Sequence, residues 1–322
     1  MSVKRAAWVS GRFRSRDGLT LHYRDYPGPG DSNFPVICLP GLLRNARDFE
    51  DLAPHLAQRS RVLCPDFRGR GASDYAPDPM SYVPNSYVRD LDMLFDALGL
   101  CEAMLVGTSL GGLVATVFSA LRPERVSGIV LTDVGPDVDP AGLARIATYV
   151  GKVPTIATWQ DAARAIALLD ETIYPGFGEQ EWLCLAKRRY VEDADGRVRL
   201  DYDLAIAQAF PLPATTPDTW PFFAQLRGIP MLVLRGALSD ILASATVERM
   251  QSVVPEMRVV DVPGRGHVPL LNEPVALAAI DAFLNDLPPL MSDAVRAERT
   301  RAGQSFRKAM AQMGNDLARL DE

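Results

Sequence analysis

The sequence contains few of the residues that build metal centres and disulfide frameworks. Its 322 residues include three histidines and four cysteines. The cysteines show no metal-ligand spacing, and Cys38 and Cys64 lie inside apolar runs, which is typical of buried, reduced thiols. Three histidines are also too few to favour a multi-histidine metal centre. We therefore predict no metal site.

Long apolar runs and an excess of positive charge are also missing. No stretch reaches the roughly 18 apolar residues of a membrane span, and residues 1–18 lack the apolar region of a signal peptide. The formal net charge is −6, which disfavours nucleic acid as a partner because phosphate binding needs clustered lysine and arginine. We expect a cytoplasmic protein that binds neither membranes nor nucleic acid.

Short apolar runs alternate with amphipathic segments along most of the chain. Residues 8–14 and 19–26 predict a hairpin around the Asp17-Gly18 turn. Strictly alternating strands and helices after it predict an α/β fold, with a parallel sheet covered on both faces. The expected strands are 36–39, 62–64, 103–106, 128–131, 230–234 and 258–262, and the expected helices are 46–57, 87–98, 110–121, 244–253 and 274–287.

The alternation stops between residues 137 and 224, where helical stretches and prolines occur without a convincing buried strand. We predict one sheet domain, residues 1–136 and 225–288, interrupted by this mostly helical insertion. The tail, residues 289–322, is predicted to be a helix docked on its own subunit, with a homodimer contact or a frayed end as alternatives. Its apolar residues are four and three positions apart: Phe306, Met310, Met313, Leu317 and Leu320.

One pentapeptide places a serine between two glycines after a predicted strand. Gly107-Thr108-Ser109-Leu110-Gly111 matches G-x-S-x-G, a weak signal alone because glycine is common. Here it follows the strand ending at residue 106 and opens the next helix, which is the setting of a nucleophile elbow. The glycines would let the backbone crowd at so sharp a turn. We predict Ser109 as a nucleophile held in strain; a tight turn in an inert protein is the alternative.

A serine hydroxyl needs a neighbouring base, and the base needs a carboxylate to orient it. His267 is the candidate base because its loop follows a strand of the parallel sheet, where such folds place their chemistry. His22 and His55 lie in early segments and are expected to be surface or packing residues. We choose Asp240 as the acid, since it follows the strand at 231–234 through the turn at 235–239 and gives the chain order Ser, Asp, His. Asp133, which follows the strand at 128–131, is its rival.

The negative oxygen of a tetrahedral intermediate needs preorganised donors. We expect the backbone N–H of Leu110, next to the nucleophile, and that of Leu42, in the loop after the strand at 36–39. Gly41 would allow the close approach of backbone there, although an ordinary turn would also explain it.

Residues 19–287 together resemble the α/β-hydrolase fold superfamily. Residues 66–73, Asp-Phe-Arg-Gly-Arg-Gly-Ala-Ser, are similar to a turn of its esterase, lactonase and C–C hydrolase branches, and Gly266-His267 with Asn272-Glu273-Pro274 is similar to its histidine loop. The resemblance implies an eight-stranded, mostly parallel sheet, a helical cap formed by residues 137–224, and no cofactor. Pro40-Gly41 departs from the His-Gly of many members.

These features together indicate a serine hydrolase that cleaves a small-molecule carboxylic ester or lactone through an acyl-enzyme on Ser109. Branches that use an aspartate nucleophile, by the same resemblance, are disfavoured. Hydrolysis of a C–C bond in a dienoic ring-fission product is an alternative. Arg44 or Arg47 could bind the carboxylate of such a substrate, unless they are solvated surface residues. A non-catalytic ligand-binding protein of the same fold is the second alternative.

Overall fold

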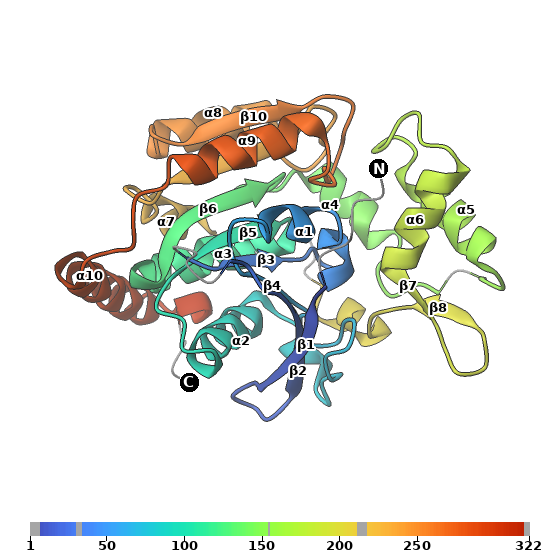
Figure 1. Cartoon of the computed structure of the whole chain (residues 1–322), viewed down its shortest axis with the longest axis horizontal. Helices are drawn as coiled ribbons and strands as arrows, with labels where there is room; N and C mark the ends of the chain where they lie inside the picture. Colours follow the sequence, from blue (N-terminus) through green and yellow to red (C-terminus); the bar gives the residue numbers. More distant parts are fainter. Residues whose placement is uncertain (1–6, 30–33, 154, 211–217, 319–322) are drawn as a thin grey trace.

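An eight-stranded sheet forms the centre of the computed structural model, which describes residues 7–29, 34–153, 155–210 and 218–318 (Figure 1). The strand order is β1-β2-β4-β3-β5-β6-β9-β10. β1 and β4 are antiparallel to β2, and the other neighbours are parallel. The predicted mostly parallel sheet is therefore confirmed. Its strands are β1 (Val9–Arg14), β2 (Thr20–Tyr26), β3 (Val36–Leu39), β4 (Val62–Pro65), β5 (Ala103–Thr108), β6 (Val126–Thr132), β9 (Met231–Gly236) and β10 (Arg258–Val262).

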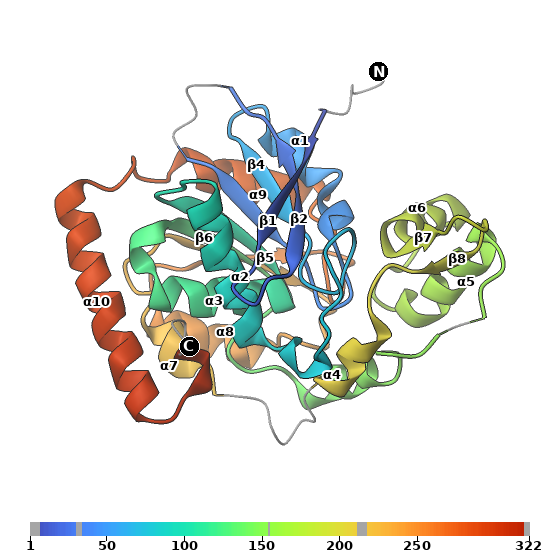
Figure 2. The same ribbon diagram turned by 90° about the horizontal axis from the view of Figure 1, so that it is seen from below.

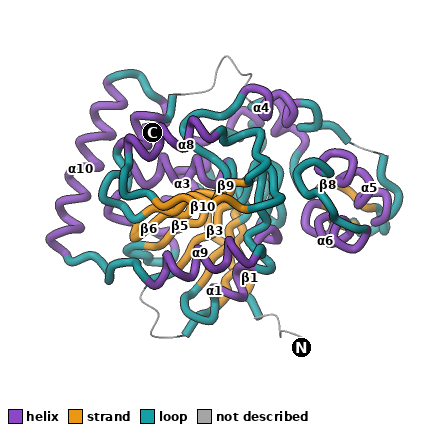
Figure 3. The backbone as a smooth tube through the Cα atoms, turned by 90° about the horizontal axis from the view of Figure 1, so that it is seen from above, coloured by secondary structure: helices purple, strands orange, loops and turns teal. Residues whose placement is uncertain are grey.

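Apolar side chains on both faces of the strands explain why the sheet is covered twice. Along β5, Leu105 joins one buried apolar cluster, whereas Met104 and Val106 join another. This alternation follows from the two-residue period of a strand. Helices complete each layer (Figure 3): α1 (Leu52–Leu56) and α9 (Pro274–Asn285) pack on one face, and α2 (Pro84–Ala97), α3 (Leu110–Leu121) and α8 (Ser244–Val253) on the other. Short 3-10 turns lie at η1 (Ala46–Phe49), η2 (Pro79–Ser81) and η3 (Pro123–Arg125).

The predicted insertion lies between β6 and β9. Figures 1 and 2 show its middle part as a lobe beside the sheet. Unlike the prediction, the lobe contains a short antiparallel hairpin, β7 (Tyr190–Glu192) and β8 (Val198–Leu200), whose three-residue strands are too short for a clear two-residue pattern. The helical elements are α4 (Pro140–Ala147), α5 (Trp159–Asp170), α6 (Glu179–Arg189), η4 (Leu204–Gln208) and α7 (Trp220–Ala224).

The tail forms α10 (Asp293–Gln312) and the turn η6 (Asp316–Ala318), on the opposite side of the sheet from the lobe (Figure 2). Met310 and Leu317 are buried in the chain's own core, and Phe306 packs edge-on against Phe222 of α7. Met313 is 77% exposed, and Leu320 lies outside the described residues. The tail helix therefore docks on its own chain, and a homodimer contact stays a prediction. Among the described residues, no helix has the length and apolar character needed to cross a membrane.

Candidate functional site

Ser109 sits at a strained turn between β5 and α3. Its φ is 51°, in the left-handed region that costs a non-glycine residue free energy. Its N–H donates to the carbonyl of Thr132 at the end of the adjacent strand β6. A Cβ on Gly107 would lie 2.5 Å from the Gly111 carbonyl oxygen, and one on Gly111 would lie 2.1 Å from that of Leu39. Both glycines of the pentapeptide are therefore required for this turn to pack.

A continuous hydrogen-bonded chain starts at the Ser109 hydroxyl. Oγ lies 2.9 Å from His267 Nε2, and His267 Nδ1 lies 2.8 Å from Asp133 Oδ2. Asp133 is fully buried, and its carboxylate also accepts from the Gly236 N–H (2.8 Å) and the Ser239 hydroxyl (2.6 Å). The carboxylate is thus held on three sides, which fixes the orientation of the imidazole.

The expectation that Asp240 orients His267 does not agree with this geometry. The Asp240 carboxylate instead pairs with Arg145 of α4, whose Nη2 lies 2.9 Å from Oδ1. Partial burial would raise the pKa of Asp240, but the hydrogen bond and charge of Arg145, together with the charge of His267, lower it overall. Asp240 is therefore part of a surface ion pair near the histidine, and the rival residue Asp133 occupies the position on Nδ1.

The close approach of the histidine loop to the end of β9 explains why His267 reaches Asp133. The histidine loop after β10 must pass over the end of β9, which separates β10 from β6 in the sheet. It passes at Gly236, where a Cβ would lie 2.5 Å from the Gly266 carbonyl oxygen. The glycine therefore lets the loop cross. The end of β9 supplies an N–H to Asp133, and the turn after β9 supplies the Ser239 hydroxyl.

The loop after β3 lies beside Ser109, as the sequence predicted. A Cβ on Gly41 would lie 3.7 Å from the Cβ of Ser109. Arg70, which is fully buried, donates from Nε to the Leu42 carbonyl at 2.7 Å and so fixes the orientation of that peptide. Within the described residues, neither the Leu42 nor the Leu110 amide donates a hydrogen bond to another group.

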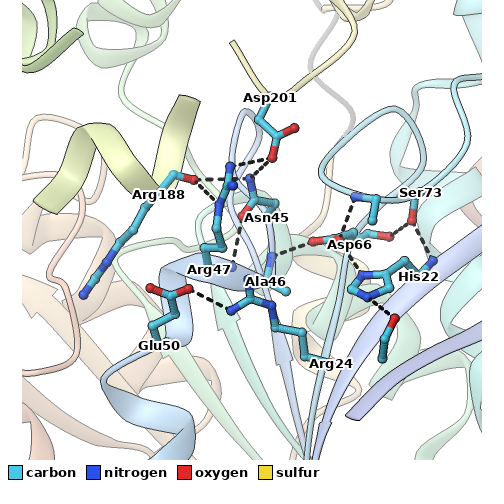
Figure 4. Close-up of polar contacts among 12 residues, drawn as sticks. His22, Arg24, Asn45, Ala46, Arg47, Glu50, Asp66, Ser73, Arg188 and Asp201 are labelled. Carbon is cyan, nitrogen blue, oxygen red and sulfur yellow. Dashed lines mark hydrogen bonds and ion pairs between the residues drawn. The ribbon is translucent and has the colours of Figure 1, made fainter. Parts of the chain in front are cut away.

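A second network anchors the far end of this loop, and Asp66 is its centre (Figure 4). The buried Asp66 carboxylate accepts from the Ala46 N–H (2.7 Å), from the Ala72 N–H (3.1 Å) and from His22 Nδ1 (2.7 Å). The other ring nitrogen of His22 lies 3.1 Å from the Ser10 hydroxyl. The chain therefore contains a second hydrogen-bonded Ser–His–Asp arrangement, which the sequence does not predict because His22 is expected there only to be a surface or packing residue.

The insertion is tied to both loops that flank Ser109. The Asn45 amide and the Arg47 guanidinium donate to the Asp201 carboxylate and to the Arg188 carbonyl (Figure 4). On the histidine side, the Tyr174 hydroxyl donates to the Val268 carbonyl at 2.7 Å. The position of the insertion is therefore coupled to both loops.

Two cavities meet at Ser109. The first, the insertion cavity, has a volume of about 380 Å³ and lies between Ser109, His267 and residues of α5 and α6. The second, the tail cavity, measures about 930 Å³, has mainly apolar walls and extends to residues 313–317 of the tail. Leu42 and Ile146 line both. A substrate whose carbonyl lies at Ser109 can therefore place one substituent in each cavity.

The arginines predicted to bind a carboxylate are already paired. Arg47 contacts Asp201, whereas Arg44 lines the insertion cavity and has Asp48 as its partner. Burial acts to lower the pKa of Arg44, but the charge of Asp48 and neighbouring groups raises it overall. Among the residues that the structure describes, no three histidine, cysteine, aspartate or glutamate side chains group in a way that could hold a metal ion.

Comparison with known proteins places this chain in a family. The profile of the alpha/beta hydrolase fold matches residues 35–274. A 3-hydroxybutyrate-oligomer hydrolase of Cupriavidus necator is 34% identical over 82% of this chain and 93% of its own length. A 2-(acetamidomethylene)succinate hydrolase of Mesorhizobium japonicum is 28% identical over 83% and 92%. The crystal structure of an alpha/beta hydrolase from Novosphingobium aromaticivorans has 47% identity and a TM-score of 0.83, covering 87% of this chain and 99% of its own. The chain belongs to the alpha/beta hydrolase fold family and is a hydrolase.

Proposed function

We propose that the chain hydrolyses a carboxylic ester or lactone through an acyl-enzyme on Ser109. The observation that carries this proposal is the hydrogen-bonded chain from Ser109 through His267 to Asp133, at the meeting point of two cavities. In this mechanism, His267 takes the hydroxyl proton as Ser109 attacks the carbonyl carbon. Asp133, and not Asp240, stabilises the imidazolium that forms.

The charge that develops on the carbonyl oxygen would be held by the backbone N–H groups of Leu42 and Leu110. The proximity of Gly41 to Ser109 supports this role, as does the lack of an acceptor for either amide among the residues that the structure describes. Such donors stabilise the tetrahedral intermediate more than the ground state, because charge develops where they point. His267 would then protonate the leaving group, and a water molecule, activated by the same histidine, would release the acid.

The part of residues 137–224 that precedes α7 would act as a cap over this site, whereas Phe222 and Phe223 of α7 pack in the main core. Side chains of this cap form much of the wall of the insertion cavity, and they contact the loops on both sides of Ser109. The ester assignment is supported by the relative from Cupriavidus necator, because an oligomer of 3-hydroxybutyrate is held together by ester bonds.

Activity assays of wild type and Ser109→Ala test the proposal. The panel contains p-nitrophenyl esters, simple lactones, 3-hydroxybutyrate oligomers and a ring-fission dienoate. Hydrolysis of an ester or lactone by wild type and its loss in Ser109→Ala support the proposal. Preference for the dienoate would favour C–C hydrolysis instead. Failure of Ser109 to react with a fluorophosphonate, together with no turnover of any substrate, would favour a binding protein.

A further inference from the structure

Arg189, the last residue of α6, lines the same cavity as Ser109 and His267. Its Nη1 lies 2.6 Å from the Asp170 carboxylate. Its Nε and Nη2 are buried and have no hydrogen-bond partner in the part of the chain that the structure describes. A buried donor without a partner is costly, and two on one guanidinium form a site that an acceptor could fill.

The Nε and Nη2 hydrogens point to the same side of a guanidinium and match the two oxygens of a carboxylate. This chain fills that edge repeatedly with its own carboxylates. Arg61 binds Asp25 in this way, and Arg145 binds Asp240. In Arg189 the same edge is buried and has no hydrogen-bond acceptor among the described residues, and the residue borders the cavity that holds the candidate nucleophile. An anionic substrate group is the acceptor that the arrangement fits.

The ion pair with Asp170 does not prevent Arg189 from binding a second carboxylate. Arg68 shows that one buried guanidinium in this chain can hold two carboxylates at once, since Asp90 occupies its Nε–Nη2 edge and Asp17 its other edge. Lys152 also lines the insertion cavity, whereas Asp170 is its only carboxylate among the described residues. The electrostatic balance of this cavity therefore favours an anion over a neutral group.

We propose that the substrate is an ester carrying a free carboxylate, which binds the Nε–Nη2 edge of Arg189 while the scissile carbonyl lies at Ser109. This inference rests on the proposed function. The apolar remainder of the substrate would extend into the tail cavity, whose walls include Leu113, Val134 and Ile206. The two cavities would thus select esters that are anionic at one end and apolar at the other.

Two matched substrate pairs test the inference. The first compares the mono-p-nitrophenyl ester of glutarate with p-nitrophenyl pentanoate, which places the carboxylate on the acyl side. The second compares 3-(butanoyloxy)butanoate with its methyl ester, which places it on the alcohol side. We expect wild type to prefer the anionic member of one pair, and Arg189→Met to reduce the ratio of the two kcat/KM values by about 10- to 100-fold. Arg189→Lys should restore part of the ratio, because it keeps the charge but not the fork.

Asp170→Asn is the matched control, since it removes the ion pair but leaves the guanidinium, and it should keep or increase the anionic preference. An equal preference for both members in wild type, or an unchanged ratio in Arg189→Met, would overturn the inference. Fluorophosphonate labelling of Ser109 separates this result from failure of the proposed function. If Ser109 is labelled but no anionic preference exists, only the inference fails; if Ser109 is not labelled and nothing is hydrolysed, both fail.

Discussion

Two regions of this molecule contain a serine, a histidine and an aspartate joined by hydrogen bonds. In one, Nε2 of His267 lies 2.9 Å from the Ser109 hydroxyl and Nδ1 lies 2.8 Å from Asp133. In the other, the corresponding distances from His22 to Ser10 and Asp66 are 3.1 and 2.7 Å. Residue types and distances alone therefore do not distinguish the two sites.

Their surroundings do distinguish them. Ser10 lies exposed on the edge strand β1, whereas Ser109 lies at a strained turn and lines two cavities. The amides of Leu42 and Leu110 donate no hydrogen bond within the described part of the chain, and they could stabilise an oxyanion. The Asp66 carboxylate, by contrast, accepts hydrogen bonds from the N–H groups of Ala46 and Ala72 and so connects two loops (Figure 4). The comparison indicates that the proposed catalytic site depends on strain, cavity and amides as much as on the three side chains.

The largest expected effect is the loss of the proposed nucleophile. Ser109→Ala should lower kcat by about 10⁶, because no other group can form the acyl-enzyme. Ser10→Ala removes the serine of the other arrangement and should leave kcat within about twofold of wild type, since Ser10 lies exposed on the edge strand β1. Steady-state assays on the best ester of the panel measure both. A large loss of kcat in Ser10→Ala would show that the two arrangements are not functionally distinct.

The second prediction compares two aspartates near the same histidine. Asp133→Asn should lower kcat by about 10⁴, because an amide on Nδ1 favours the wrong imidazole tautomer and cannot stabilise the imidazolium. Asp240→Asn should lower kcat by less than about tenfold, since it only weakens the ion pair with Arg145. Rate measurements on folded variants, checked by circular dichroism, decide between them. The reverse order of effects would restore Asp240 as the orienting acid.

The same pair shows where sequence reasoning ends. Asp133 and Asp240 both follow strands of the sheet, so chain order and strand position leave either able to reach the histidine. The choice depends on where the histidine loop crosses β9, and that crossing is set by packing at Gly236. Three-dimensional contacts between loops carry no local sequence signal, which is why the sequence favours Asp240 whereas Asp133 lies on Nδ1 of His267 in the structure.

More of the fold than of the site could be predicted from the sequence, because the fold follows from local patterns. The two-residue alternation within strands and the apolar stripe of α2, with Val88, Leu91 and Phe95 buried, determine which faces are covered. The β7–β8 hairpin was missed because its strands have three residues each. The sequence also could not predict that Nε and Nη2 of Arg189 lack an acceptor among the described residues, since this depends on how α5 and α6 pack.

The third prediction concerns stability at the second arrangement. His22→Ala should lower the free energy of unfolding by about 1–3 kcal/mol, because it leaves the buried Asp66 carboxylate without one of its donors. Urea unfolding measures the change. Ser10→Ala is the control and should cost less than about 1 kcal/mol, since an exposed hydroxyl regains hydrogen bonds from water. Equal losses in the two variants would contradict the view that Asp66 is the structural centre.

The smallest expected effect is the pH dependence that Asp240 gives to stability. Its pKa is lowered in the native state, because Arg145 outweighs the opposing effect of partial burial. The unfolded chain, with a pKa near 3.8 for this group, therefore binds its proton more readily than the native protein does. The Asp240 contribution is present above about pH 5 and is lost as the pH falls below 3.8 through the native pKa.

Asp240→Asn should therefore destabilise the protein near pH 6 and approach the stability of wild type near pH 3. Because the Asp240 side chain is 38% exposed, solvent screens the pair and the difference should be about 0.5 kcal/mol or less. Urea midpoints between pH 3 and 6 provide the measurement. Arg145→Met should abolish the same pH-dependent contribution. If both variants keep the wild-type pH dependence, the ion pair does not contribute to it. The argument that Asp133 and not Asp240 orients His267 would then rest on the hydrogen bond from His267 Nδ1 to Asp133 alone.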